Sequence, residues 1–257
     1  MGTGMFQDIR GRVALVTGAS SGLGAHFATV LARQGCRVAL AARREDRLAG
    51  HTAAIVAAGG EAAAVAMDVA SPESIRAGLT RIEERFGPVE LLVNNAGLAA
   101  GHGFLAAPRA ETERVFAVNQ TGVWEVTQQV CARLVAVGKP GAIVNIASIT
   151  GLRAVGGAAS YAVTKAAVAH MTRVQALELA RHGIRVNAIA PGYFETELTQ
   201  DFLASEAGDK LRKRVPMRRI GHLNELDGPL LLLLSEAGSF MTGTVIPVDG
   251  GHLLNSL

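Results

Sequence analysis

Aromatic residues, cysteines and long apolar runs are scarce in this sequence of 257 residues, and each shortage argues against a class of structure or site. Aromatic residues make up only 4%, which fits closely packed helices on a sheet better than an all-β sandwich. The two cysteines, Cys36 and Cys131, occur in apolar patterns without metal-ligand spacing, so we expect reduced core thiols and no metal site. The leucine run at 230–234 is far too short to span a bilayer.

Neither sign of charge dominates, with 22 acidic against 25 basic residues and a formal net charge of +3. The arginines are scattered, whereas nucleic-acid binders usually gather them on one face. The densest group of cations, which we interpret as a solvated surface segment, comprises Lys210, Arg212, Lys213, Arg214, Arg218 and Arg219. The first residues contain no apolar signal segment. We therefore expect a soluble, cytoplasmic protein that binds neither nucleic acid nor membrane.

Hydrophobic residues, by contrast, make up 49% of the chain and recur in short and long blocks. Short runs rich in β-branched residues predict strands, and stretches with helical spacing follow them. The predicted strands are 12–18, 37–42, 63–69, 90–96, 142–148 and 184–190. The first predicted helix ends at Gln34, the second begins near Glu45, the third runs from Pro72 to Gly87, and two more cover 111–137 and 160–181. Such βα repeats predict an α/β fold with a parallel sheet covered on both faces.

No linker, internal repeat or change in composition divides the chain, so we expect one domain over residues 1–257. Residues 192–222 are polar, charged and irregular, and we interpret them as a lid over the carboxyl edge of the sheet. The apolar residues of this lid favour a ketone substrate with an apolar part; they are Tyr193, Phe194, Leu198, Phe202 and Leu203.

A glycine-rich stretch, "TGASSGLG" at 17–24, joins the first predicted strand to the first helix. Gly18, Gly22 and Gly24 allow the backbone to turn tightly and to approach a ligand closely. Amide groups at a helix N-terminus attract phosphate, so this position predicts a dinucleotide site. The spacing is G-x-x-x-G-x-G rather than the common G-x-G-x-x-G.

The end of the second predicted strand reads "LAARRE" and indicates which dinucleotide binds. Ala42 stands where a carboxylate would accept hydrogen bonds from the adenosine ribose, and Arg43 and Arg44 follow it. Arginine pairs with a 2′-phosphate, so we expect NADP(H) rather than NAD(H). The alternative is that both arginines are ordinary surface residues at a helix start.

Tyr161, one of two tyrosines, lies four residues before Lys165, one of four lysines. Residues at this spacing share a helix face, and a nearby positive charge lowers the pKa of a phenol from about 10 toward neutrality. We therefore expect Tyr161 to act as a general acid in carbonyl reduction. The alternative is a surface pair of little consequence. Ser148 ends the predicted strand 142–148, where ligands bind in open α/β sheets, and its hydroxyl can hold a substrate oxygen beside the phenol.

With these motifs the sequence resembles the single-domain branch of the short-chain dehydrogenase/reductase family. The resemblance runs over nearly the whole chain, through "TGASSGLG", Asp68, "NNAG" (94–97), Asn119, Ser148, "YAVTK" (161–165), "PGYFET" (191–196) and "VDGG" (248–251). It implies a Rossmann-like doubly wound sheet of about seven strands and a homotetramer.

The resemblance also implies roles for individual residues. Asn119, Ser148, Tyr161 and Lys165 would form a catalytic tetrad, in which Asn119 holds a water of a proton relay and Lys165 binds the nicotinamide ribose. The implied cofactor contacts are Gly18, Ser20, Ser21, Gly22, Leu23, Gly24, Arg43, Arg44, Asp68, Val69, Asn95, Ala96, Gly97, Tyr161, Lys165, Pro191, Gly192, Phe194 and Thr196.

These features predict an NADP(H)-dependent ketoreductase that exchanges hydride with a carbonyl or secondary alcohol. Three alternatives stay open at this point. They are a 3-oxoacyl-thioester reductase acting on acyl carrier protein or coenzyme A derivatives, an NAD-dependent alcohol, steroid or sugar dehydrogenase, and a non-enzymatic NADP-binding regulator. The cation group at 210–219 supports the first of these, because such thioesters carry phosphates or acids.

Overall fold

A parallel sheet forms the centre of the computed structural model, which describes residues 6–196 and 199–254 apart from the side chains of Gln200 and Phe202. In this described part the sheet has seven strands in the order β3-β2-β1-β4-β5-β6-β7. They are β1 Val13–Thr17, β2 Arg37–Ala42, β3 Glu61–Ala66, β4 Leu91–Asn94, β5 Gly141–Ile146, β6 Ile184–Pro191 and β7 Val245–Val248. The predicted α/β fold class is confirmed.

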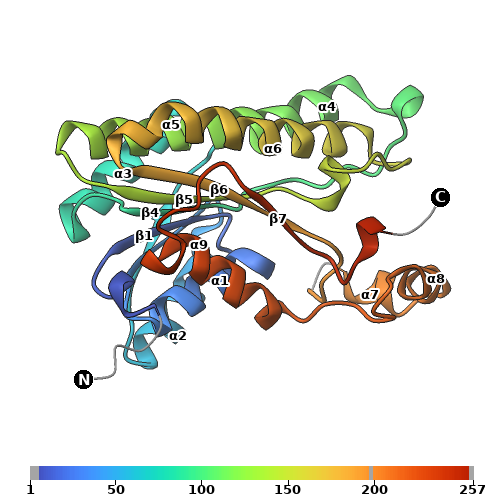
Figure 1. The fold of residues 1–257 in the computed structure, drawn as a ribbon, viewed down its shortest axis with the longest axis horizontal. Helices are drawn as coiled ribbons and strands as arrows, with labels where there is room; N and C mark the ends of the chain where they lie inside the picture. Colours follow the sequence, from blue (N-terminus) through green and yellow to red (C-terminus); the bar gives the residue numbers. More distant parts are fainter. Residues whose placement is uncertain (1–5, 197–198, 255–257) are drawn as a thin grey trace.

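Helices cover both faces of this sheet (Figure 1). One face carries α3 Pro72–Phe86, α4 Arg109–Phe116, α5 Gly122–Ala136 and α6 Ala159–Leu179; the other carries α1 Gly22–Arg33, α2 Glu45–Ala57 and α9 Asp227–Leu234. Every residue of β1, β4 and β5 is buried, because apolar side chains of a doubly covered sheet find helices on either side. Burial between two layers of helices therefore explains the short apolar runs in the sequence.

The leucine run belongs to α9, where Leu230, Leu231, Leu233 and Leu234 are buried against the sheet and α1. Within the described residues, no helix is both long and apolar enough to cross a membrane.

The sheet order places a ligand crevice beside β1. This strand pairs with β2 on one side and with β4 on the other, so the connections turn in opposite directions from here. At such a switch point the loops after the two strands separate and leave a crevice at the carboxyl edge. Here those loops are the glycine-rich turn after β1 and the "NNAG" segment after β4.

Some predicted boundaries differ from the structure. The helix predicted at 111–137 consists of α4 and α5 joined by a π-helical turn at Ala117–Thr121, and such turns often mark functional positions. The fifth strand ends at Ile146, so Ser148 lies two residues beyond it. The predicted lid contains the short helices α7 Gln200–Leu203 and α8 Glu206–Arg214, which lie beyond the carboxyl edge (Figure 1). Leu198 and the side chain of Phe202 fall outside the described part.

Candidate active site

A cavity of about 550 Å³ opens along the carboxyl edge, where the loops after the strands converge. Its wall includes nearly all of the residues proposed from the sequence: Gly18, Ser20, Ser21, Gly22, Leu23, Arg43, Arg44, Asp68, Val69, Asn95, Ala96, Gly97, Ser148, Tyr161, Lys165, Pro191, Gly192, Phe194 and Thr196. Gly24 and Asn119 are not part of this wall. Segments far apart in the sequence therefore meet around one space.

Gly24 is packed closely against the glycine-rich turn, and its contact with a cofactor stays a prediction. A Cβ atom on Gly24 would be 2.4 Å from the Gly18 oxygen and 2.5 Å from Nδ2 of Asn95. Gly18 has φ +65°, and its own Cβ would meet Ala96 Cα at 2.7 Å. Both glycines are needed because the turn, α1 and the "NNAG" segment approach one another closely.

Thr17, at the end of β1, ties the same two loops together and was missed in the sequence. Its buried hydroxyl accepts hydrogen bonds from the backbone amides of Asn95 and Ala96, at 3.1 Å each. Asn95 in return donates through Nδ2 to the oxygens of Thr17 and Gly18, at 3.0 and 3.2 Å. A hydroxyl at the end of an otherwise apolar strand was the available signal.

One end of the cavity carries exposed cations. Arg44 donates through Nη2 to Ser20 Oγ at 3.1 Å, which joins the α2 start to the glycine-rich turn. Arg43 lies beside it on the cavity wall, and Ala42 leaves the end of β2 without a carboxylate. Among the described residues of the wall, Asp68 is the only acid; its Oδ1 accepts a hydrogen bond from the Ala70 amide at 3.0 Å.

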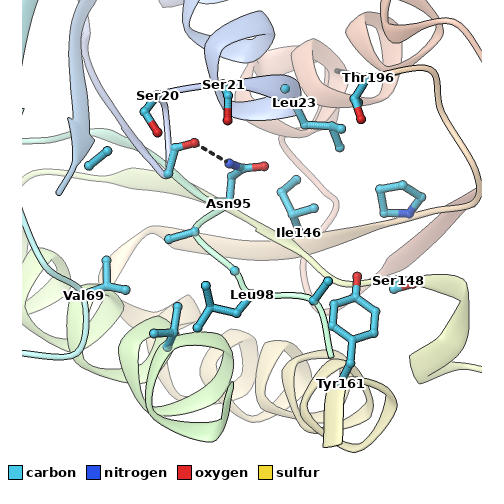
Figure 2. A pocket seen from close by; sticks show the side chains of 18 of the residues that line it. Ser20, Ser21, Leu23, Val69, Asn95, Leu98, Ile146, Ser148, Tyr161 and Thr196 are labelled. Carbon is cyan, nitrogen blue, oxygen red and sulfur yellow. Dashed lines mark hydrogen bonds between the residues drawn. The ribbon is translucent and has the colours of Figure 1, made fainter. Parts of the chain in front are cut away.

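The other end brings Ser148, Tyr161 and Lys165 together. Tyr161 lies in the first turn of α6, and its hydroxyl points toward Ser148 across the cavity from Ser21 and Thr196 (Figure 2). Ser148 lies next to the Tyr161 hydroxyl and lowers the pKa of this phenol. Lys165 is 5% exposed, one turn farther along α6, and donates through Nζ to the Ile146 oxygen at 2.8 Å. The predicted meeting of these three side chains is therefore observed in the structure.

The pKa of Tyr161 differs from the expectation. Burial raises the pKa of this phenol above its ordinary value, the nearby Ser148 hydroxyl lowers it, and Tyr193 raises it. Burial also lowers the pKa of Lys165 to about 8. The Lys165 ammonium lies 5.6 Å from the centroid of the Tyr161 ring and is held by a backbone oxygen. The expected acidification by Lys165 is therefore not found in the ligand-free protein, where desolvation is the largest influence on the pKa of Tyr161.

Asn119 lies in the π-helical turn and is fully buried. Its Oδ1 accepts from the Leu98 amide at 2.7 Å, while Nδ2 donates to the Leu98 oxygen at 2.9 Å and to Thr164 Oγ1 at 3.3 Å. The side chain therefore braces the loop after β4 against α6, behind the cavity wall. Its role in holding a water stays a prediction.

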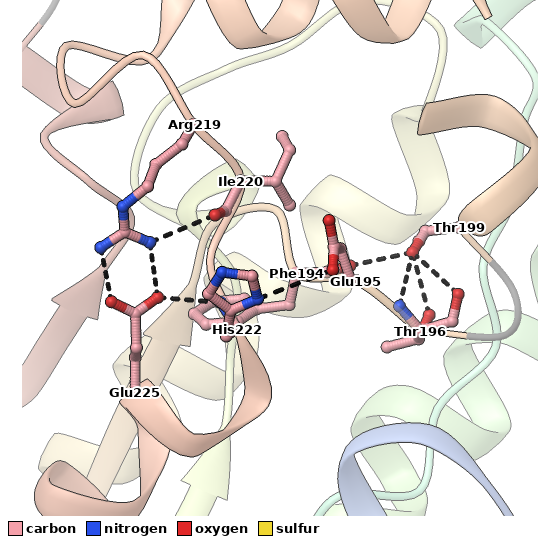
Figure 3. Close-up of polar contacts among 8 residues, drawn as sticks. All are labelled: Phe194, Glu195, Thr196, Thr199, Arg219, Ile220, His222 and Glu225. Atoms are coloured by element: carbon pink, nitrogen blue, oxygen red, sulfur yellow. Dashed lines mark hydrogen bonds and ion pairs between the residues drawn. The ribbon is translucent and has the colours of Figure 1, made fainter. Parts of the chain in front are cut away.

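The lid is anchored to the end of β6. Phe194 forms an isolated parallel bridge with Gly221, where a Cβ would lie 2.6 Å from the Phe194 ring. Thr199, also missed in the sequence, accepts a hydrogen bond from the Thr196 amide at 2.9 Å and donates to the Phe194 oxygen at 2.9 Å. Figure 3 shows these contacts beside the His222–Glu195 pair, which is 3.6 Å apart. Thr196 is thereby held on the cavity wall.

Acids within and just after the lid pair with several of its cations. Arg219 forms a two-pronged contact with Glu225, at 2.7 and 2.6 Å, and this contact lowers the pKa of Glu225 to about 2 (Figure 3). Lys210 pairs with Glu206 at 2.7 Å, and Arg212 pairs with Asp209. Three cations of the 210–219 segment are therefore paired with acids that flank it.

His102, in the irregular segment after β4, pairs through Nδ1 with Glu111 Oε1 at 2.9 Å. It does not belong to the cavity wall. Cys36 and Cys131 are buried free thiols, and burial raises the pKa of each to about 12. No group of residues suited to a metal ion occurs in the described ranges.

Comparisons with known proteins agree with this geometry. A family model described as enoyl-(acyl carrier protein) reductase matches residues 18–252. Gluconate 5-dehydrogenase of Gluconobacter oxydans (strain 621H) is 38% identical over 245 residues, which is 95% of each chain.

Solved structures of related enzymes also resemble this chain in fold and in sequence. A gluconate 5-dehydrogenase from Burkholderia cenocepacia J2315, in complex with NADP and tartrate, has a TM-score of 0.92 and 35% identity, covering 98% of this chain and 99% of the other. A variant of actinorhodin polyketide ketoreductase with NADPH has a TM-score of 0.90 and 36% identity, covering 97% and 99%. The chain belongs to the short-chain dehydrogenase/reductase family and is an oxidoreductase that acts on CH–OH or C=O groups with a nicotinamide cofactor.

Proposed function

We propose that this protein is an NADP(H)-dependent ketoreductase, reversible as a secondary-alcohol dehydrogenase. The observation that carries the proposal is the meeting of Ser148, Tyr161 and the buried Lys165 in the cavity that the glycine-rich turn also lines. A hydroxyl donor, a proton donor and a cation at one end of a dinucleotide-sized cavity suit the conversion of a carbonyl to an alkoxide and then to an alcohol.

The cavity wall fits a dinucleotide phosphate. Ser21 precedes α1 without a side-chain cap, and the first turn of α1 contains no acid. A Cβ on Gly22 would find its nearest neighbour, a methyl group of Thr196, only at 3.9 Å, so open space faces this backbone. Uncapped amides at a helix N-terminus bind phosphate. Gly22 and its neighbours would therefore hold the pyrophosphate of the cofactor.

Arg43 and Arg44 support NADP(H) over NAD(H), because their guanidinium groups suit a 2′-phosphate and Ala42 presents no competing carboxylate. We expect kcat/KM to be higher for NADPH than for NADH. Arg43→Ala should reduce the NADPH value about tenfold or more and leave the NADH value nearly unchanged. Equal efficiency with the two cofactors in the parent enzyme would contradict this preference.

The bound nicotinamide supplies or accepts the hydride. In reduction, Tyr161 donates its phenolic proton to the substrate oxygen, and Ser148 donates a hydrogen bond to the same oxygen as negative charge develops there. In oxidation the Tyr161 phenolate removes the proton from the alcohol. Lys165 holds positive charge close to Tyr161, and Asn119 keeps the loop after β4 in place against α6.

The substrate end favours a ketone with an apolar part, since Leu98, Ala99, Tyr193 and Phe194 line it. A sugar or sugar-acid substrate is the second candidate, favoured by the similarity to gluconate 5-dehydrogenases. The thioester alternative has less support, because Lys210, Arg212 and Arg219 pair with neighbouring acids. Rates with a panel of ketones, keto sugar acids and 3-oxoacyl thioesters would distinguish the three classes.

Tyr161→Phe tests the mechanism. This change removes only the hydroxyl, so NADPH affinity and thermal stability should stay close to those of the parent while turnover on the best ketone falls by about a thousandfold. NADPH binding is measured by fluorescence and turnover by NADPH consumption. Retention of parental turnover with intact NADPH binding would exclude Tyr161 as the proton donor.

A homotetramer and a cytoplasmic location remain predictions. Exposed apolar side chains on α5 and α6, Trp124 at 45% and Leu177 at 82%, support self-association. Light scattering on the purified protein measures the oligomeric state.

A further inference from the structure

Thr150 directs both of its donor groups at Ser148. The Thr150 amide donates to Ser148 Oγ at 3.2 Å, and its hydroxyl donates to the same oxygen at 3.0 Å. A serine hydroxyl has two lone pairs and one hydrogen. With both lone pairs engaged by Thr150, the Ser148 hydroxyl can act toward the cavity only as a donor.

The turn that carries Thr150 is held firmly against α6. Ser148 caps the 3₁₀ turn Ile149–Gly151, and Ile149 is buried. A Cβ on Gly151 would lie 2.4 Å from the carbonyl carbon of Lys165, so the turn touches the α6 backbone one helical turn after Tyr161. This close approach fixes where Thr150 lies relative to Ser148 and Tyr161.

We propose that Thr150 is a positioning residue that makes Ser148 an obligate hydrogen-bond donor to the Tyr161 oxygen and, during reaction, to the substrate oxygen. The catalytic part of this statement rests on the proposed function, whereas the effect on Tyr161 does not. Without the Thr150 hydroxyl, one lone pair of Ser148 becomes available and can accept from the neutral phenol. That arrangement stabilises the protonated form of Tyr161.

The chain allows this effect to be measured without any substrate. It has two tyrosines, so Tyr193→Phe leaves Tyr161 as the only phenol, and tyrosinate absorbance then reports its pKa alone. The other groups that act on the Tyr161 phenol are Lys165 on the same helix and Tyr193 after β6. Lys165 is unchanged in every variant, and Tyr193 is removed from all of them.

In this background, Thr150→Val should raise the Tyr161 pKa, and Thr150→Ser, which keeps the hydroxyl, should leave it in place. In a Ser148→Ala background, Thr150→Val should have no effect, because its target oxygen is gone. Thr29→Val is the matched control, since its hydroxyl bonds only to the Ala25 oxygen within α1. Circular dichroism at each pH restricts the titration to folded protein. If the valine variant does not fold, Thr150→Ala carries the same prediction.

The kinetic counterpart uses the parent with both tyrosines. Thr150→Val should lower kcat/KM for ketone reduction about tenfold and move its alkaline limb to higher pH, with NADPH affinity unchanged. An unchanged Tyr161 pKa in Thr150→Val, or an equal change with and without Ser148, would overturn the proposal. Absence of ketone reduction by the parent would refute the proposed function instead, and the titration would still decide the role of Thr150.

Discussion

Replacing Lys165 with methionine should stabilise the ligand-free protein while abolishing its activity. Lys165 is 5% exposed, and burial lowers its pKa from 10.5 to about 8. Such a shift corresponds to about 3 kcal/mol of preference for the neutral form, so at neutral pH the charged side chain destabilises the fold by this order. Methionine has a similar length and no charge. The Ile146 oxygen loses its donor, but Ile146 lines the cavity, where water can replace it.

We therefore expect Lys165→Met to increase the free energy of unfolding by about 2–3 kcal/mol at pH 7. The pH dependence carries the sharper test. Below pH 8 the lysine is protonated in both the folded and the unfolded protein, so the difference between variant and parent is constant. Between pH 8 and 10.5 the unfolded chain still binds the proton that the folded protein has released, so the parent gains stability as pH rises. The advantage of the variant should therefore shrink across this range.

Urea unfolding of both proteins at pH 7, 8, 9, 10 and 10.5 measures these differences, because all other titrating groups are common to the pair. Lys139→Met is the matched control: Lys139 is 48% exposed and pairs with Glu90 at 3.5 Å, so its replacement should change stability by less than about 1 kcal/mol. A Lys165→Met variant no more stable than the parent at pH 7, or an advantage unaffected by pH from 8 to 10.5, would refute the assigned desolvation of Lys165.

Two further changes test the cavity wall. Gly24→Ala should destabilise the fold by about 3 kcal/mol, because its Cβ would lie 2.4 Å from the Gly18 oxygen. Gly50→Ala in α2 is the control: its Cβ meets nothing within 4 Å, so the change should be neutral or stabilising. Thermal unfolding of both variants gives the comparison. Thr199→Val removes the acceptor of the Thr196 amide and should weaken NADPH binding about tenfold in a fluorescence titration. Thr199→Ser keeps the hydroxyl and should bind NADPH as the parent does. Equal NADPH affinities of the valine variant and the parent would show that Thr199 does not support the cofactor site.

The sequence was most informative about the strands, because burial on both faces of the sheet gives each of them a short apolar run. Strands covered on both faces are mostly apolar, apart from single polar residues such as the buried Asn94, Asn145 and Asn187. β1, β2, β4, β5 and β6 were all recognised from these apolar runs. The elements that escaped lack such a pattern. β7 is a half-exposed edge strand that contains Pro247, and α9 is apolar on every side, so neither shows the expected alternation.

The candidate site shows a similar division. Glycines, the Tyr161–Lys165 spacing and the strand-end serine are visible because each residue type is uncommon or is placed at a boundary. Thr17, Thr150 and Thr199 are common residues whose importance comes from the few oxygens and amides that each side chain meets. Tertiary contacts between distant segments create these pairs, and local spacing carries little trace of them.

The proton affinity of Tyr161 shows most clearly what spacing leaves open. Two helix residues at i and i+4 share a face whether they lie in water or in the core, but the balance between charge attraction and desolvation depends on burial. Here α6 packs against the Ile149–Gly151 turn and covers both side chains, so desolvation raises the pKa of the phenol and lowers that of the ammonium. The nearby Ser148 hydroxyl opposes this rise, so the orientation that Thr150 gives to that hydroxyl bears directly on the acidity of Tyr161.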